Sequence, residues 1–368
     1  MSTQRLWLRC EKKEFERRTA ITPTTAKKLI DAGFEISVER DSQRIFKDEE
    51  YEAAGCTLVE HNSWPSAPVD VPIIGLKELP VSEDPLPHTH IQFAHCYKQQ
   101  GGWSKVLARF HKGHGTLYDL EFLTDDQGRR VAAFGYHAGF AGSAAGALAL
   151  AAERAGKPLG QLEPFENEDA MVEGVRQALG GSAKGLKVIV IGALGRCGRG
   201  AVDLFRKVGV EEDDIMKWDM AETAKGGPFP EILEADIFVN CIYLATPIPP
   251  FMTHEQVKVA GKERRLRVVV DVSCDTTNPH NPIPIYSVNT TFAKPTVPVE
   301  VGCGNPPLAM VSIDHLPTLL PREASEQFST NLLPSLLELP QRESARVWVE
   351  AEKLFKTKLS EAVAVEGL

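Results

Sequence analysis

Residues 187–219 read KVIVIGALGRCGRGAVDLFRKVGVEEDDIMKWD, and this stretch decides the fold. A fully apolar run, an amphipathic run and a second apolar run predict a buried strand, a helix and another strand, over Val188–Ile191, Ala201–Val208 and Ile215–Trp218. Three glycines separate the first strand from the helix, at Gly192, Gly195 and Gly198. This order is typical of a domain that binds a dinucleotide.

The glycines and the acid that follows them suit such a ligand. Glycine lets the backbone turn tightly and approach a pyrophosphate, and the start of the helix supplies N–H donors. Asp219 follows the last glycine by about 20 residues, where a carboxylate can accept the ribose hydroxyls. Because a carboxylate there repels a 2′-phosphate, we expect NAD rather than NADP. A glycine motif alone would fit an ordinary strand–turn–helix, but here strand, helix, second strand and acid agree.

The composition bounds the class of protein. The chain has 368 residues, 43% of them hydrophobic and 25% charged, which suits a globular protein of two domains. A formal net charge of −9 argues against nucleic acid or an anionic membrane as a partner. No apolar run of about 20 residues predicts a membrane span, and the ends resemble neither a signal peptide nor a peroxisomal tripeptide. We therefore expect a cytoplasmic protein with no membrane partner.

The first third of the chain has its own α/β pattern without a glycine fingerprint. Thr22 predicts a helix cap, with Pro23 in the first turn and the end of the helix at Gly33. The predicted strands are Leu6–Leu8, Phe34–Val38, Val71–Leu76, His90–Tyr97 and Thr116–Leu123, and Trp103–His111 is a predicted helix. We expect this domain to hold the substrate.

The remainder predicts the second domain and a return to the first. Small residues over Phe134–Glu153 predict a long, closely packed helix that crosses between the domains. The later strands are Val188–Ile191, Ile215–Trp218, Ile237–Tyr243, Val268–Val272 and Met310–Ile313, and Leu319–Lys358 is expected to be helical with breaks at Pro334 and Pro340. The predicted fold is α/β, with two Rossmann-like doubly wound domains, residues 1–134 with 320–368 and residues 135–319. The active site is expected in a cleft between them.

The chain has seven cysteines, at positions 10, 56, 96, 197, 241, 274 and 303, without zinc spacing. Most are expected to be small buried hydrophobic residues. Cys197 lies in the glycine loop and Cys241 follows the apolar run 237–240, so both should lie at the carboxyl edge of the sheet. We expect them to be close enough to form a disulfide on oxidation.

Several long segments together resemble one family. They are Ile73–Pro80 (IIGLKELP), His90–Lys98 (HIQFAHCYK), Lys112–Leu123 (KGHGTLYDLEFL), Asp126–Gly135 (DQGRRVAAFG), Ile191–Gly198 (IGALGRCG), Asp271–Tyr286 (DVSCDTTNPHNPIPIY) and Ser312–Ser325 (SIDHLPTLLPREAS). They resemble the fungal saccharopine dehydrogenases of the NAD-dependent, lysine-forming type, within the alanine dehydrogenase-like superfamily. The similarity runs nearly end to end.

The resemblance implies a reversible reaction in which saccharopine, NAD⁺ and water give lysine, 2-oxoglutarate and NADH. Hydride leaves a carbon next to a secondary amine, an imine forms, and water hydrolyses it. This is the final step of lysine biosynthesis through the α-aminoadipate pathway. Members of this family are usually monomeric, so we expect a monomer.

The resemblance also assigns proton carriers. Lys77 follows a predicted buried strand and would otherwise be read as a surface lysine. As a general base for the amine it needs a pKa lowered by burial or by neighbouring cations. His95 would otherwise be a core histidine, and the resemblance implies proton transfer during imine hydrolysis. Glu78 and Glu121 match acids that tune the charge of the site. No ligand spacing in the histidine-rich region from 88 to 114 supports a metal.

A substrate with three carboxylates calls for arginines, because guanidinium can bind a carboxylate at two points. Arg18 and Arg130 match substrate-binding positions, whereas Arg129 is expected nearer the cofactor. Without the resemblance, Arg129 and Arg130 would be a solvated basic pair at a turn. Four further residues match positions around the site, Gln100 and Phe134 as substrate contacts and Lys13 and Glu16 as tuning charges.

On the cofactor side, the resemblance places Gly195 and Arg196 at the pyrophosphate and Asp219 and Thr223 at the adenosine ribose. Further cofactor contacts are expected from Tyr243, Val272, Ile313, Asp314, His315 and Leu316. Asp314 could equally cap a helix that begins at Leu316.

Two alternative functions stay open. One is another amino-acid dehydrogenase of the alanine dehydrogenase type, which takes pyruvate and ammonia. The extra arginines argue against it, since they suggest a bulkier, polyanionic substrate. The other is a non-catalytic protein that senses NAD(H), against which Lys77 and His95 argue because a sensor needs neither.

Overall fold

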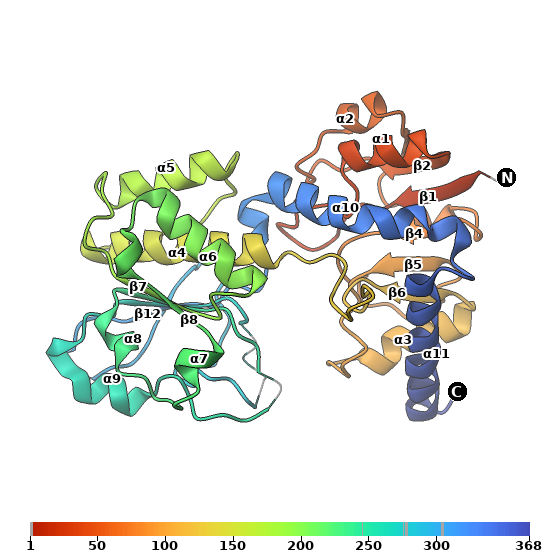
Figure 1. Ribbon diagram of the computed structural model, residues 1–368. Helices are drawn as coiled ribbons and strands as arrows, with labels where there is room; N and C mark the ends of the chain where they lie inside the picture. The colour runs from red at the N-terminus through yellow and green to blue at the C-terminus, as the bar shows by residue number, and fades with distance from the viewer. Residues whose placement is uncertain (1–2, 245, 275, 277–278, 303–304) are drawn as a thin grey trace. The chain divides into compact units, whose positions relative to one another are not determined.

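The computed structural model describes residues 3–244, 246–274, 276, 279–302 and 305–368, so Cys303 lies outside the described residues. The chain divides into two compact units. Unit 1 comprises Met1–Ala133 and Pro321–Leu368, and unit 2 comprises Phe134–Leu320. Each unit is built on its own sheet (Figure 1).

The sheet of unit 1 has the order β3-β2-β1-β4-β5-β6, with every neighbouring pair parallel. Its strands are β1 (Gln4–Leu8), β2 (Phe34–Glu39), β3 (Thr57–Val59), β4 (Ile73–Ile74), β5 (Thr89–Gln92) and β6 (Thr116–Asp119). The strand order reverses between β1 and β4, which makes that point the switch point of a doubly wound sheet. The carboxyl ends of all six strands share one edge.

The helices of unit 1 cover both faces of this sheet. They are α1 (Pro23–Asp31), α2 (Asp48–Ala53), α3 (Trp103–Gly113), α10 (Pro321–Leu337) and α11 (Arg346–Glu366), with 3₁₀ turns at Trp64–Ser66 and Leu339–Gln341. The predicted cap of α1 is confirmed, because the Thr22 side chain accepts from the Thr25 N–H. Helix α1 packs on α10, and α3 packs on α11 through Phe110 and Phe355 (Figure 1).

The sheet of unit 2 has the order β11-β12-β10-β9-β7-β8 and is parallel except for the pairing of β11 with β12. Its strands are β7 (Val188–Ile191), β8 (Ile215–Trp218), β9 (Ile237–Asn240), β10 (Val268–Asp271), β11 (Val297–Pro298) and β12 (Ala309–Val311). The switch point lies between β7 and β9, because the chain runs from β7 to β8 on one side and then to β9 on the other.

Two helical layers bury the two faces of this sheet (Figure 1). One layer has α4 (Gly135–Arg154), α5 (Glu168–Ala178) and α6 (Arg196–Val208), and the other has α7 (Met220–Thr223), α8 (Glu231–Glu234) and α9 (His254–Ala260). The 3₁₀ turns are Glu212–Asp214, Gly261–Glu263 and Leu316–Leu319. Alternate strand residues point to opposite layers, Val188 and Val190 to the first and Ile189 and Ile191 to the second.

The packing of α4 on α6 depends on glycine. A Cβ atom at Gly139 would lie 1.9 Å from the Cys197 carbonyl oxygen, and one at Gly200 would lie 1.9 Å from the Tyr136 carbonyl oxygen. The two helix backbones are therefore in direct contact at two reciprocal points. The small residues of the long helix were expected to allow such close packing, and they do.

The prediction of two Rossmann-like α/β domains is confirmed, but several element boundaries were wrong. The predicted strands Val71–Leu76, His90–Tyr97, Thr116–Leu123 and Ile237–Tyr243 are shorter. In the first three, the apolar run continues into buried residues beyond the last ladder pair, whereas Ile237–Tyr243 ends in the half-buried Cys241 and the exposed Tyr243. Helix α6 begins at Arg196 rather than Ala201, since its first turn contains the glycine motif and lacks an apolar stripe.

Two further expectations about helices were wrong. Helix α4 lies wholly within unit 2 and does not cross between units. Pro334 lies inside α10 and does not break it. The carbonyl that Pro334 leaves without an N–H partner belongs to Thr330, which is exposed, so water can bind it. Within the described ranges, no helix is long and apolar enough to cross a membrane.

The helix contact predicts the effect of one methyl group. We expect Gly139→Ala to lower the free energy of unfolding by about 2 kcal/mol, because the added Cβ meets backbone atoms that cannot rotate away. Gly135→Ala, on the same helix, is the matched control, since its Cβ would meet nothing closer than 3.7 Å. Urea unfolding of both variants measures the difference. Equal stabilities would show that α4 and α6 are not in backbone contact.

Candidate functional site

A cluster of charged side chains lies at the carboxyl edge of the unit 1 sheet. Lys77 follows β4, His95 follows β5, and Glu121 follows β6. Arg18 lies in the segment that joins β1 to α1. Because parallel strands end at the same edge, residues far apart in sequence converge here.

The most buried pair in the cluster is Glu16 with Arg18. Arg18 donates from Nε to Glu16 Oε1 at 2.7 Å and from Nη2 to Oε2 at 2.6 Å, and both side chains are buried. Burial by itself would raise the pKa of Glu16, but the Arg18 guanidinium and the Lys77 ammonium outweigh it and bring the pKa to about 2. Glu16 is therefore a permanent negative charge beside Arg18 and Lys77.

Glu78 joins three cationic or titratable groups. Its Oε1 lies 3.6 Å from Lys13 Nζ, and its Oε2 lies 3.9 Å from His95 Nε2. Burial opposes ionisation, yet a backbone hydrogen bond and the charges of Lys13, Lys77 and His95 hold the pKa of Glu78 below its ordinary value. Lys13, Lys77, Glu78 and His95 thus form one electrostatic group.

Glu121 holds a second cationic group. It accepts from Lys98 Nζ at 2.7 Å and from Arg130 Nη2 at 2.9 Å. Gln100 borders the same segment and accepts from the Lys98 N–H through its Oε1 at 3.1 Å. Sequence reasoning missed Lys98, although its place three residues after His95 was a usable signal.

Asp119, at the end of β6, was also missed. It is buried, and its two oxygens accept from the Ala94 N–H at 3.2 Å and the Glu121 N–H at 2.9 Å. Burial raises the pKa of this carboxyl to about 7, although both backbone hydrogen bonds lower it. Asp119 therefore holds the two loops that carry His95 and Glu121.

Two further predicted residues are Arg129 and Phe134. Arg129 is exposed and pairs with Asp125 at 2.9 Å within its own turn. Phe134 belongs to unit 2, where it begins α4 as the cap residue. His88 and His90 are buried against Trp64.

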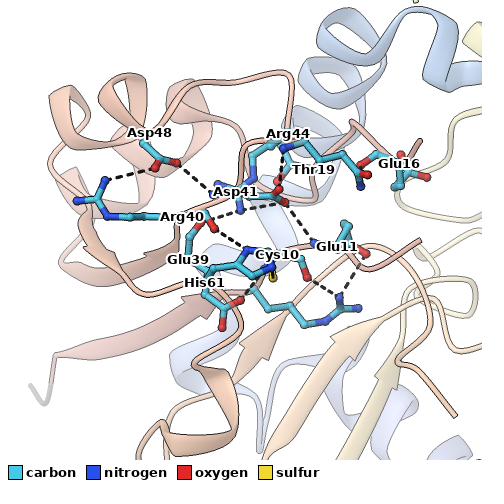
Figure 2. A network of polar contacts seen from close by, with 12 residues as sticks. Cys10, Glu11, Glu16, Thr19, Glu39, Arg40, Asp41, Arg44, Asp48 and His61 are labelled. Atoms are coloured by element: carbon cyan, nitrogen blue, oxygen red, sulfur yellow. Dashed lines mark hydrogen bonds and ion pairs between the residues drawn. The ribbon is translucent and has the colours of Figure 1, made fainter. Parts of the chain in front are cut away.

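A second polar network lies next to the cluster, at the ends of β1 and β2 (Figure 2). The buried Glu39 carboxylate accepts from the backbone N–H groups of Cys10, Asn62 and Trp64 and from the Trp7 indole. It therefore connects β1, β2 and the segment after β3. Asp41 accepts from the Glu11 N–H at 3.4 Å, in the segment that follows β1.

In unit 2, the glycine loop has the geometry of a dinucleotide-binding turn. Gly192 has a φ of 87°, which favours glycine. A Cβ at Gly198 would lie 2.1 Å from the Gly192 carbonyl oxygen, so this glycine lets α6 start directly against the turn. Gly195 is the cap residue and Arg196 the first residue of α6, and both are exposed. The N–H groups at the start of a 13-residue helix are thus available to a pyrophosphate.

Asp219 lies at the end of β8, beside this loop. Its Oδ2 accepts from the Leu194 N–H at 3.1 Å and its Oδ1 from the Met220 N–H at 2.9 Å. Thr223 is one turn further and donates to the Asp219 carbonyl at 2.9 Å. The carboxylate retains lone pairs for ribose hydroxyls, so this group of residues fits a bound dinucleotide.

The other predicted cofactor residues follow the remaining strands of unit 2. Tyr243 follows β9 and is exposed, and Val272 follows β10. Ile313, His315 and Leu316 lie after β12 with the exposed Asp314. The proposed capping role of Asp314 was wrong, because the cap of the 3₁₀ turn at Leu316–Leu319 is His315. Asp271, which sequence reasoning missed, accepts from Asn240 and Tyr286 and ties β9 to β10.

The two cysteines near this edge are free thiols. Cys197 lies in the first turn of α6, and Cys241 follows β9. A hydrogen bond with Cys197, followed by burial, raises the pKa of the Cys241 thiol well above its ordinary value. The two side chains are therefore in contact without a covalent bond. Among the residues whose placement is described, no group of three or more His, Cys, Asp or Glu could hold a metal ion.

Comparison with known proteins gives the affiliation of the chain. Residues 7–141 match the family described as alanine dehydrogenase/PNT, N-terminal domain. Two solved structures share the fold. An L-alanine dehydrogenase has a TM-score of 0.67 at 16% identity, covering 95% of this chain and 94% of that one. A transhydrogenase from Sinorhizobium meliloti has a TM-score of 0.62 at 17% identity, covering 90% and 92%.

Two curated proteins are similar along their whole length, and both are called saccharopine dehydrogenase [NAD(+), L-lysine-forming]. The one from Yarrowia lipolytica is 59% identical over 95% of this chain and 96% of its own. The one from Schizosaccharomyces pombe is 58% identical over 97% and 99%. At this identity and coverage, the chain belongs to the family of NAD(+)-dependent, L-lysine-forming saccharopine dehydrogenases.

Proposed function

We propose that this chain oxidises saccharopine with NAD⁺ and water to lysine, 2-oxoglutarate and NADH, as the final step of lysine biosynthesis through the α-aminoadipate pathway. The observation that carries the proposal is the 59% identity, over nearly both whole chains, with a protein named for this reaction. The charged cluster of unit 1 supports it, because a substrate with three carboxylates and two amine nitrogens needs both cations and anions around it.

In the proposed reaction, Lys77 accepts the proton of the secondary amine, so that the nitrogen lone pair can form the C=N bond as hydride leaves the adjacent carbon. When bound, NAD⁺ accepts this hydride at its nicotinamide ring. His95 then takes a proton from the water that attacks the imine carbon, and the nitrogen of the resulting carbinolamine regains the proton that Lys77 had accepted. The C–N bond breaks as the hydroxyl gives up its proton and forms the C=O bond, which releases lysine and 2-oxoglutarate. Glu78 interacts with both residues and can balance the charge as protons move between them.

The remaining residues bind and orient. Arg18 and Arg130 offer guanidinium groups to the substrate carboxylates, with Gln100 and Phe134 as further contacts. Lys13, Glu16 and Glu121 tune the charge around them. On the cofactor side, the glycine loop and Asp219 bind the dinucleotide, with Arg129, Thr223, Tyr243, Val272 and residues 313–316 as further contacts.

The function is tested by following NADH absorbance with the purified chain. We expect NADH loss with lysine plus 2-oxoglutarate and none with pyruvate plus ammonia. Loss only with pyruvate and ammonia would move the chain to the alanine dehydrogenase reaction. NADH binding without turnover in either mixture would favour a sensor.

The role of Lys77 predicts the behaviour of Lys77→Met. Turnover should fall by roughly 10²-fold or more, because a general base contributes about that much. Binding of NADH, measured by fluorescence, should be unchanged, since the predicted dinucleotide site lies in unit 2. Near-normal turnover would remove Lys77 from the mechanism.

The contacts of Asp219 predict a change in cofactor preference. Asp219→Ala should weaken NAD⁺ binding by about tenfold or more, because a charged acceptor of hydrogen bonds is lost. The preference for NAD⁺ over NADP⁺ should narrow, since no carboxylate repels the 2′-phosphate. Titration with both cofactors measures the two constants. An unchanged preference would place the ribose-binding acid elsewhere.

We also propose that the chain is a cytoplasmic monomer and that Cys197 and Cys241 form a disulfide on oxidation. Light scattering should give a mass near 40.4 kDa, and a fluorescent fusion should fill the cytoplasm.

The disulfide between Cys197 and Cys241 is tested with diamide as oxidant, where each thiol loses a proton and the pair loses two electrons. Digestion without reductant should then release a linked peptide, and its absence would reject the disulfide.

A further inference from the structure

The backbone of Lys77 is held by two buried charged side chains. Glu11 accepts from the Leu76 N–H through Oε1 at 2.6 Å and from the Lys77 N–H through Oε2 at 3.0 Å. Arg9 donates from Nη2 to the Lys77 carbonyl oxygen. Both peptide groups that flank the Lys77 Cα atom are therefore fixed.

The two charged side chains also hold each other. Arg9 Nη1 lies 3.3 Å from Glu11 Oε2 and donates to the Cys10 carbonyl at 3.0 Å. Their side chains are 1% and 5% exposed. Because little of either side chain reaches water, neither can leave the pair without leaving a buried partner unsatisfied.

The pair occupies the switch point of the unit 1 sheet. Arg9 and Glu11 follow β1, and Lys77 follows β4, the two strands between which the strand order reverses. The guanidinium fits there because residue 75 is glycine, whose Cβ would lie 2.3 Å from the Arg9 Cζ atom. Arg9 also donates to Gln92 Oε1 at 3.2 Å, at the end of β5. The Arg9 guanidinium thus occupies the space beside Gly75 at the switch point.

Stability alone is a poor explanation of this arrangement. The desolvation cost of a buried ion pair roughly cancels its attraction, so the attraction between Arg9 and Glu11 adds little stability by itself. Apolar residues could not bind the two N–H groups and the carbonyl around Lys77. The pair therefore differs from apolar residues in one respect, which is that it fixes the backbone at Lys77.

We propose that Arg9 and Glu11 are positioning residues for the reaction. They hold the Lys77 Cα atom, from which the reacting side chain extends, in a fixed place. The inference rests on the proposed function, in which Lys77 is the base. Lys77 interacts with the carboxylates of Glu16 and Glu78, whose own charged neighbours are Arg18, Lys13 and His95. A displaced Lys77 would lose part of its attraction to both carboxylates, and its amine would release its proton more readily.

The test compares Glu11→Gln with a matched control, Asp236→Asn. The carboxylate of Asp236 is also buried, accepts a backbone N–H from Lys187 at 2.9 Å and pairs with Arg265 at 2.8 Å, but it lies at the start of β9 in unit 2. Both variants should lose stability in urea. Only Glu11→Gln should lower kcat, by roughly tenfold to a hundredfold, with KM for NAD⁺ unchanged, because a small misplacement of a reacting group costs about that much.

A second readout does not need the substrate. Acetic anhydride labels unprotonated lysines, and the labelled fraction of the peptide that contains Lys77 can be followed by mass against pH. In Glu11→Gln the midpoint should fall by about half a pH unit or more, whereas the control should keep the wild-type midpoint. If Glu11→Gln does not fold, Glu11→Asp replaces it, since the shorter side chain keeps the charge but cannot reach both N–H groups.

The outcomes separate the inference from the proposed function. A wild-type chain that turns over no saccharopine rejects the function, and the labelling midpoint still decides the positioning role. Wild-type kcat and an unchanged midpoint in Glu11→Gln, with stability lowered as in the control, would overturn the inference and leave a purely structural ion pair.

Discussion

Buried or half-buried carboxylates that accept backbone N–H groups at the ends of parallel strands are the interaction on which both units depend. A parallel strand that leaves its sheet exposes N–H groups in the following loop, and these need acceptors. Glu11, Glu39 and Asp119 supply them in unit 1, and Asp219 and Asp271 supply them in unit 2. Each acid thereby fixes a loop that carries candidate functional residues.

The comparison of Glu39 with Asp219 explains why one sheet suits a dinucleotide and the other does not. Both acids end the strand next to the first strand of their sheet, the position of a ribose-binding acid. Glu39 is fully buried and already accepts four N–H groups, so it has no capacity for a ligand. Asp219 is half-buried and accepts from two backbone N–H groups of its own surroundings. The acid in this position is thus fully occupied by the protein in unit 1 and remains available to a ligand in unit 2.

The sequence predicted what depends on local pattern. The glycine spacing, the apolar strand before it and Asp219 together specified unit 2, because turn geometry and helix start are encoded within about 30 residues. Thr22 and Pro23 likewise specified the start of α1. Strand ends were harder to predict, since residues such as Leu76 are buried by packing beyond the ladder and look like strand.

The hydrogen bonds that Arg9 and Glu11 make with the backbone at Lys77 could not have been predicted from local pattern. Arg9 and Glu11 lie more than 60 positions from Lys77, in a charged segment that resembles a solvated loop. Only the pairing of β1 with β4 brings them together. Asp119 was missed for the same reason, because the Ala94 N–H that it accepts follows another strand. Residue type alone does not tell a buried acceptor from a surface acid.

His95 shows how such an acid can sustain a strained residue. Its φ is 50°, a left-handed conformation that costs a non-glycine residue about 1–2 kcal/mol. The Ala94 N–H donates to Asp119, and the His95 ring stacks on Phe93, so the segment that leads into His95 is held through its backbone and through a side chain. Burial raises the pKa of Asp119 to about 7, which means that the carboxyl gains a proton as the pH falls below neutrality. Because the folded protein binds this proton more tightly than the unfolded chain does, the contribution of Asp119 to the stability of the loop that carries His95 declines as the pH rises through about 7. The orientation of the imidazole is therefore linked to a titration in the same pH range as that of an ordinary histidine.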